Sequence, residues 1–284
     1  MICNYFSQPS NVLDFLEVSV SISLTISSIQ HFKNINCFSN DGLLPWYLFK
    51  KNYKPPFMSY GIFDHLFDRR GMFLMNMLRI IMLPLLIIGN EEIHLLILFL
   101  ITLLTILIYI RSAIMCNAAD QVNNIILTGL LIHYLLESAY GALASQVHLD
   151  ATSNPAVIYF FASLLIISYC SSGLLKIHQI KWRNGVYLKQ VMVTRNFRHP
   201  ILLKVIRGVN RRKFKYISQM IIIWQVTSFL MPLLPNPLFY FYLFMCFSFH
   251  LVTGFLLRLN SFIWTFTGLL PCLIYAHEKI FACL

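Results

Sequence analysis

Eight stretches of about 20 mostly apolar residues recur along the 284-residue chain. A helix of about 20 residues crosses the hydrocarbon layer of a bilayer, and helices satisfy their own backbone hydrogen bonds there. We therefore expect an all-α integral membrane protein: a polytopic bundle of about eight transmembrane helices plus an amphipathic interfacial helix. The expected spans are 12–30, 72–89, 93–110, 123–144, 156–176, 215–234, 238–257 and 261–276. The first is rich in Ser and Thr, so a surface position is its alternative.

The composition favours one transmembrane domain over residues 1–284. Only 12% of the residues are charged, against about 25% in soluble domains. The net charge of +11 lies next to the apolar stretches. Anionic lipid headgroups or an acidic partner protein are therefore the expected targets, and nucleic acid is not.

Positive charge is concentrated between residues 176 and 215, where 12 of the 22 Lys and Arg residues occur without any Asp or Glu. Such a run beside membrane spans is typical of a cytoplasmic loop, here residues 177–214. Eight spans with both termini outside place 20 of the 22 basic residues on one side. The N-terminus has no basic segment typical of a cleavable signal peptide, so we expect the first span to remain as an anchor.

Part of this basic loop has helical periodicity. After Pro200, the apolar residues Ile201, Leu202, Val205, Ile206 and Val209 recur at helical spacing, with basic residues on the other faces. This pattern predicts an amphipathic helix in the headgroup plane. It would bind anionic lipids or an acidic partner.

Soluble-enzyme and metal-binding motifs are missing from the sequence. There is no GxSxG, P-loop, GxGxxG or HExxH motif, and the seven cysteines form no CxxC pair. An inverted repeat typical of transporters is not visible. Without a CxxC pair or an HExxH motif, we expect no metal site of a familiar type. Without a visible inverted repeat, a transporter is disfavoured.

Ionisable residues inside the apolar stretches are candidate functional groups, because each costs roughly 2.5–3.5 kcal/mol to insert. His133 and Glu137 lie four residues apart, on one helix face, and His250 lies in the middle of the seventh span. The two residues of the fourth span could connect helices, handle protons, or form a metal site with His250. Arg79, within the second span, is expected to pair with an acidic neighbour or to snorkel.

Three motifs in order resemble the HTTM domain, the membrane module of vitamin K-dependent gamma-carboxylase. They are SNDGLLPW (39–46), SSGLLKIHQIKWRNG (171–185) and SFHLVTGFLLRLNSFIW (248–264). Asp120 also fits the family pattern. The resemblance covers residues 12–277.

The resemblance implies functional roles for individual residues. In the carboxylase, the lysine matching Lys176 is a catalytic base in hydroquinone oxidation, so Lys176 becomes a catalytic candidate with His133, Glu137 and His250. Trp182 and Asp120 are the motif residues expected at a cofactor. Which cofactor binds, if any, is left open.

Two functions follow from the resemblance. Short family members resemble the sporulation-delaying-protein B group, which matures a secreted peptide toxin with a small partner. The resemblance therefore implies a protein of a bacterial inner membrane that assists maturation or export of a small secreted peptide together with a partner protein. The alternative is a membrane-embedded enzyme acting on a quinone or lipid. A structural subunit of a membrane complex is a third possibility.

Overall fold

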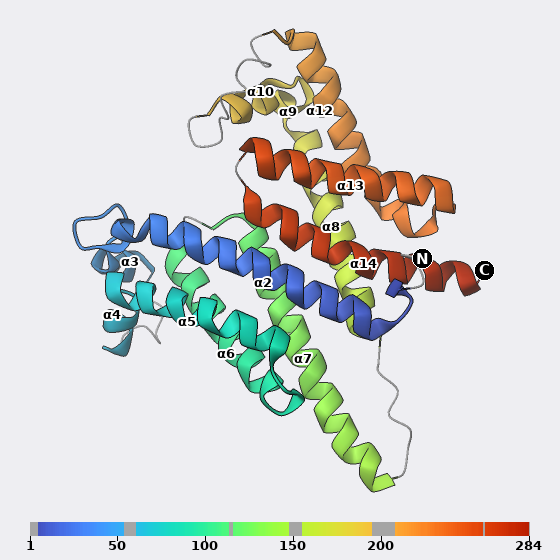
Figure 1. Ribbon diagram of the computed structural model, residues 1–284. Coiled ribbons are helices and arrows are strands. Elements are labelled where there is room, and N and C mark those ends of the chain that lie inside the picture. Colours follow the sequence, from blue (N-terminus) through green and yellow to red (C-terminus); the bar gives the residue numbers. More distant parts are fainter. Residues whose placement is uncertain are drawn as a thin grey trace. The chain divides into compact units, whose positions relative to one another are not determined.

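The computed structural model describes residues 5–53, 61–113, 116–147, 155–194, 208–257 and 259–283, and these residues contain helices and no strands. Eight long helices overlap the eight expected spans (Figure 1). They are α2 (Pro9–Lys33), α5 (Arg69–Ile88), α6 (Glu91–Ser112), α7 (Ala118–Val147), α8 (Ala156–His178), α12 (Arg211–Val226), α13 (Asn236–Leu257) and α14 (Asn260–Cys283). The expected all-α class is confirmed.

Seven of the described helices are long and apolar enough to cross a membrane, which makes the chain a multi-pass membrane protein. The sixth of these continues α12 through a 3₁₀ segment, η3 (Thr227–Leu233). Helix α14 is not among the seven, since Glu278, Lys279 and several hydroxyl residues lower its hydropathy. An eighth span at α14 remains a prediction.

Helix α2 lies inside the bundle, so the surface alternative for the first span is wrong. In α2, 61% of the apolar window is buried, against at most 33% in the other six spans. Five of its serines are buried: Ser19, Ser21, Ser23, Ser27 and Ser28. A Ser-rich helix suits this position because small side chains allow close packing and hydroxyls bond neighbouring helices.

The chain forms two compact units: unit 1 contains residues 1–19 and 153–284, and unit 2 contains residues 20–152. The boundary falls within α2, so one continuous helix contributes to both units. The expectation of a single domain is not tested by this division and remains a prediction.

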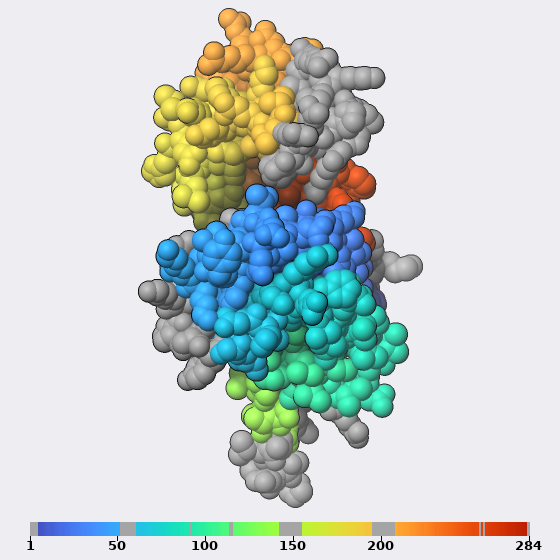
Figure 2. Space-filling model, turned by 90° about the vertical axis from the view of Figure 1, so that its left-hand side faces the viewer, coloured from blue at the N-terminus to red at the C-terminus, as the bar shows by residue number. Residues whose placement is uncertain are grey.

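In unit 2, α5 packs on α6 and α6 on α7. The connection from α2 to α5 contains η1 (Ile35–Phe38), α3 (Trp46–Tyr53) and α4 (Ile62–Leu66). The blue residues of α2 and α3 and the teal residues of α5 form a continuous surface of this unit (Figure 2).

Arg111, at the end of α6, holds this connection in place. Its Nε donates to the carbonyl of Phe67 at 2.8 Å, and its Nη2 donates to the carbonyl of Leu44 at 2.5 Å. The guanidinium carbon lies 4.9 Å from the ring centre of Phe38 and 5.7 Å from that of Trp46. The first motif therefore packs around a buried arginine through cation–π and hydrogen-bond contacts.

In unit 1, α8 packs against both α12 and α14, and α13 packs against α14. The predicted loop 177–214 is folded where it is described: it contains α9 (Ile180–Arg183), α10 (Val186–Val193) and the first turn of α12. Most of the amphipathic helix expected at 201–209 lies outside the described residues, as do Arg195, Arg198, Lys204 and Arg207.

Candidate functional site

Lys176, in the last turn of α8, is bound by neutral groups. Its Nζ donates to Oε1 of Gln225 at 2.9 Å and to the carbonyl of Ser172 at 3.2 Å. It also donates to the Ser172 hydroxyl and lies 5.4 Å from the ring centre of Trp182. No carboxylate is within salt-bridge distance of Nζ among the described residues. The amine is thus held in position without neutralisation of its charge.

Two glycines of the same motif permit close contact with α12. A Cβ at Gly173 would lie 2.8 Å from Cγ2 and from the backbone nitrogen of Val226. Gly185 has φ +70°, and a Cβ there would lie 2.4 Å from the backbone of Phe214. A residue with a side chain would be strained at Gly185 and would clash at both positions. The small residues at the start of this motif thus allow close contact between α8 and α12.

Trp182 connects the same two segments. Its carbonyl accepts a hydrogen bond from the hydroxyl of Ser218 on α12 at 2.6 Å. Its ring also contacts Tyr187 of α10, with ring centres 6.0 Å apart. The resemblance implied a catalytic role for Lys176 and a cofactor-binding role for Trp182. In the structure, both residues lie against α12.

His250 is buried in unit 1 beside an aromatic cluster. Its Nε2 lies 2.6 Å from the hydroxyl of Tyr169, and its ring stacks on Phe266 at 4.3 Å with an interplanar angle of 6°. Nδ1 has no hydrogen-bond partner among the described residues. Tyr169 precedes Lys176 by seven residues on α8, which is about 10 Å along the helix. His250 thus contacts α8 at a different position from that of Lys176.

His133 and Glu137 are brought together on α7, as their spacing predicted. Nε2 of His133 and Oε2 of Glu137 are 3.6 Å apart, and the histidine is buried whereas 40% of the glutamate side chain is exposed. This distance is longer than a hydrogen bond. In the part of the chain that the structure describes, no group of three His, Cys, Asp or Glu residues could hold a metal ion. The metal-site alternative therefore has no support.

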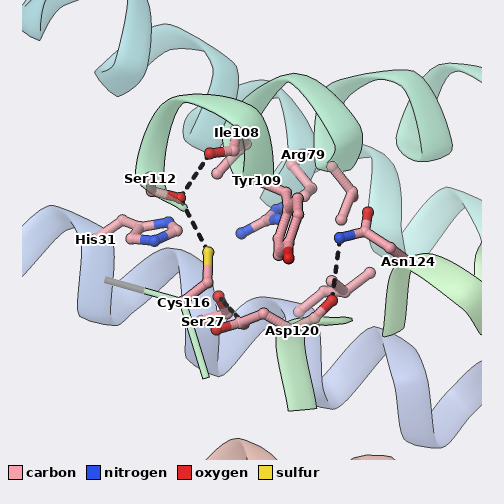
Figure 3. A pocket seen from close by; sticks show the side chains of 11 residues that line it. Ser27, His31, Arg79, Ile108, Tyr109, Ser112, Cys116, Asp120 and Asn124 are labelled. Atoms are coloured by element: carbon pink, nitrogen blue, oxygen red, sulfur yellow. Dashed lines mark hydrogen bonds between the residues drawn. The ribbon is translucent and has the colours of Figure 1, made fainter. Parts of the chain in front are cut away.

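Asp120 lies in the first turn of α7 and lines a pocket in unit 2 (Figure 3). Its Oδ1 accepts from the hydroxyl of Ser27 at 3.0 Å, and its Oδ2 accepts from the backbone nitrogen of Asn117 at 2.9 Å. A carboxylate is favoured at a helix N-terminus by the unpaired N–H groups there. These contacts fix the carboxylate at one wall of the pocket.

Arg79 forms another wall of this pocket. It is 1% exposed, so the snorkelling alternative is wrong. Its Nε and Nη2 donate to the hydroxyl of Ser28 at 2.9 and 2.7 Å, and Nη2 also donates to Oδ1 of Asn76 at 3.3 Å. Nδ1 of His31 lies 3.2 Å from the same Asn76 oxygen. The buried guanidinium is therefore solvated by neutral side chains of α2 and α5.

Sequence reasoning missed most of this pocket. His31, Ser27 and Ser23 lie four residues apart in turn, and this spacing places them on one face of α2. That polar stripe could have indicated an inward-facing polar cluster. Asn76, three residues before Arg79, gave no comparable indication.

The chain was compared with protein-family models, with curated proteins and with solved structures, and none of them matches. The resemblance to the HTTM domain therefore rests on the sequence motifs alone.

Proposed function

We propose that this chain is an HTTM-type protein of a bacterial cell membrane that assists maturation or export of a small secreted peptide together with a partner protein. The observation that carries the proposal is that α12 contacts four residues of the second motif. Gly173, Lys176, Trp182 and Gly185 each meet a residue of this helix. The motif is thus a single built site in which one lysine is positioned.

A basic surface adjoins this site and supports the partner protein in the proposal. Seven Lys and Arg residues of α9, α10 and the first two turns of α12 are exposed: Lys181, Arg183, Lys189, Arg211, Arg212, Lys213 and Lys215. An acidic segment of a partner is the complementary surface, since opposite charges speed association and fix orientation. Anionic lipid headgroups would bind the same surface.

The test is deletion of the gene, followed by mass spectrometry of the secreted peptides and complementation with variants. We expect one peptide product to disappear on deletion and to return with the wild-type chain. Lys176→Ala should fail to restore it, whereas Lys51→Ala, at an exposed lysine of α3, should restore it. An unchanged set of secreted peptides after deletion would rule out this function.

A membrane-embedded enzyme acting on a quinone or lipid is the second candidate, and the neutral partners of Lys176 favour it. A lysine without a carboxylate partner can lose its proton more readily than a paired one and act as a general base. Mass spectrometry of lipids and quinones bound to the purified protein tests this candidate: a bound quinone lost in Lys176→Ala supports it. Unchanged activity of Lys176→Ala at normal protein levels rules out the base.

A further inference from the structure

Several polar side chains line the pocket in unit 2, although it lies within apolar helices. It is lined from α2, α5, α6 and α7 and by Cys116, which precedes α7. Figure 3 shows the guanidinium of Arg79 pointing into the pocket from one side and the carboxylate of Asp120 from another. The space is roughly that of one water molecule.

The two opposite charges in this pocket do not pair directly. Arg79 donates its hydrogen bonds to Ser28 and Asn76. The Asp120 carboxylate accepts hydrogen bonds from Ser27 and from the backbone nitrogen of Asn117. A buried charge without a close counter-ion costs several kcal/mol unless polar groups solvate it. The space between the two charges is therefore suited to a polar molecule and not to a hydrocarbon group.

A third group in the pocket lacks a partner. The amide of Asn124 donates from Nδ2 to the carbonyl of Asp120 at 3.0 Å, but its Oδ1 is buried and has no hydrogen-bond partner among the described residues. A buried, unsatisfied acceptor costs about 1–3 kcal/mol. The pocket thus presents a cationic donor on one side and two acceptors on the other.

We propose that this pocket binds ordered water that accepts from the Arg79 guanidinium and donates to the Asp120 carboxylate and the Asn124 amide oxygen. Water fits because it both donates and accepts, is neutral, and has the required size; a buried water with two to four polar partners is a stable structural element. Asp120 lies in the first turn of α7 and Ser112 is the last residue of α6, so the site lies next to the α6–α7 connection.

Hydroxyl-radical footprinting of the detergent-purified full chain tests this inference, because radicals formed at bound water label adjacent side chains. His31 is the reporter: it is buried and lines the pocket. His277 is the control, since it is also buried but stacks on Phe239. We expect clear labelling of His31 and almost none of His277. Equal labelling of the two would overturn the proposal.

A variant and an isotope measurement complete the test. Asn124→Leu should remove an acceptor, fill the space and reduce labelling of His31 to the level of His277. Asn34→Leu, at an exposed position, should leave it unchanged. In the wild-type chain, oxygen from H₂¹⁸O should reach His31 more slowly than exposed His65 if the water is bound. Equally fast uptake at both would overturn the proposal even if Asn124→Leu fails to fold.

Discussion

The guanidinium of Arg111 donates to the carbonyl of Leu44, 67 residues earlier in the chain, at 2.5 Å. This bond joins the end of α6 to the first motif, and the second donation from Arg111 reaches Phe67, just before α5. Arg111 thereby connects both ends of the segment that contains η1, α3 and α4. The rings of Phe38 and Trp46 complete its surroundings.

Substitution of Arg111 should therefore destabilise unit 2. Arg111→Gln leaves buried carbonyls without donors and removes the cation–π contacts, so we expect a loss of about 2–3 kcal/mol. Thermal unfolding of the purified protein measures this loss. Arg69→Gln, at an exposed arginine of the same unit, is the control and should unfold at the wild-type temperature. Equal midpoints for the two variants would contradict the role of Arg111.

A side chain at Gly173 should destabilise the contact between α8 and α12. The added Cβ of Gly173→Ala would lie 2.8 Å from Val226, and overpacking of this kind costs about 1–3 kcal/mol. Gly141→Ala is the matched control, because Gly141 also lies in a helix and nothing surrounds its Cβ within 4 Å. The control should be stabilising by about 0.5–1 kcal/mol. Opposite shifts in the unfolding midpoint are the expected result.

Acid should weaken the contact between Asp64 and α3. The hydrogen bonds from Lys50 at 2.8 Å and from Nε1 of Trp46 at 2.6 Å hold the pKa of Asp64 below its usual range. Because the folded pKa is depressed, the stabilisation is complete above the unfolded pKa, about 3.9. It is lost as the pH falls through the folded pKa.

The measurement is unfolding as a function of pH for the wild type and Asp64→Asn. The stabilities of the two proteins should differ near neutral pH and converge at low pH. The difference near neutral pH should be small, because the Asp64 side chain is 44% exposed. A constant difference at all pH values would show that the charge of Asp64 is not responsible.

The thiol of Cys116 should react slowly with alkylating reagents. Burial raises its pKa to about 11, so its thiolate, the reactive form, is scarce at pH 8. We expect alkylation roughly two orders of magnitude slower than for an ordinary thiol with a pKa near 8.5. The measurement compares the alkylation rate of a variant in which Cys116 is the sole cysteine with that of a variant in which Cys37 is the sole cysteine. Similar rates would contradict the burial of Cys116.

The spans could be predicted from the sequence because lipid fixes both the length and the apolar character of a crossing helix. Each expected span overlaps a long helix, and the ends differ by a few residues. Helices α9 and α10, with four and eight residues, were not predicted. Such short helices depend on tertiary contacts, here the contacts of Trp182 and Gly185 with α12, which no local pattern reveals.

The candidate site was predictable only in part. The pair of His133 and Glu137 follows from helical spacing within one helix, and the structure brings these residues together. The pocket around Arg79 depends on which helices are neighbours, and periodicity carries no information on that. Asp120 and Arg79 were therefore singled out separately, without their shared pocket.

The boundary between the two units within α2 has a consequence for biogenesis. The first half of α2 belongs to unit 1, but its partners in that unit begin at residue 153. Translation at 5–20 residues per second places these partners roughly 7–27 s later. Unit 2 is synthesised as one continuous segment in that interval. During membrane insertion, the inner face of this first half therefore remains without its partners in unit 1 for this interval.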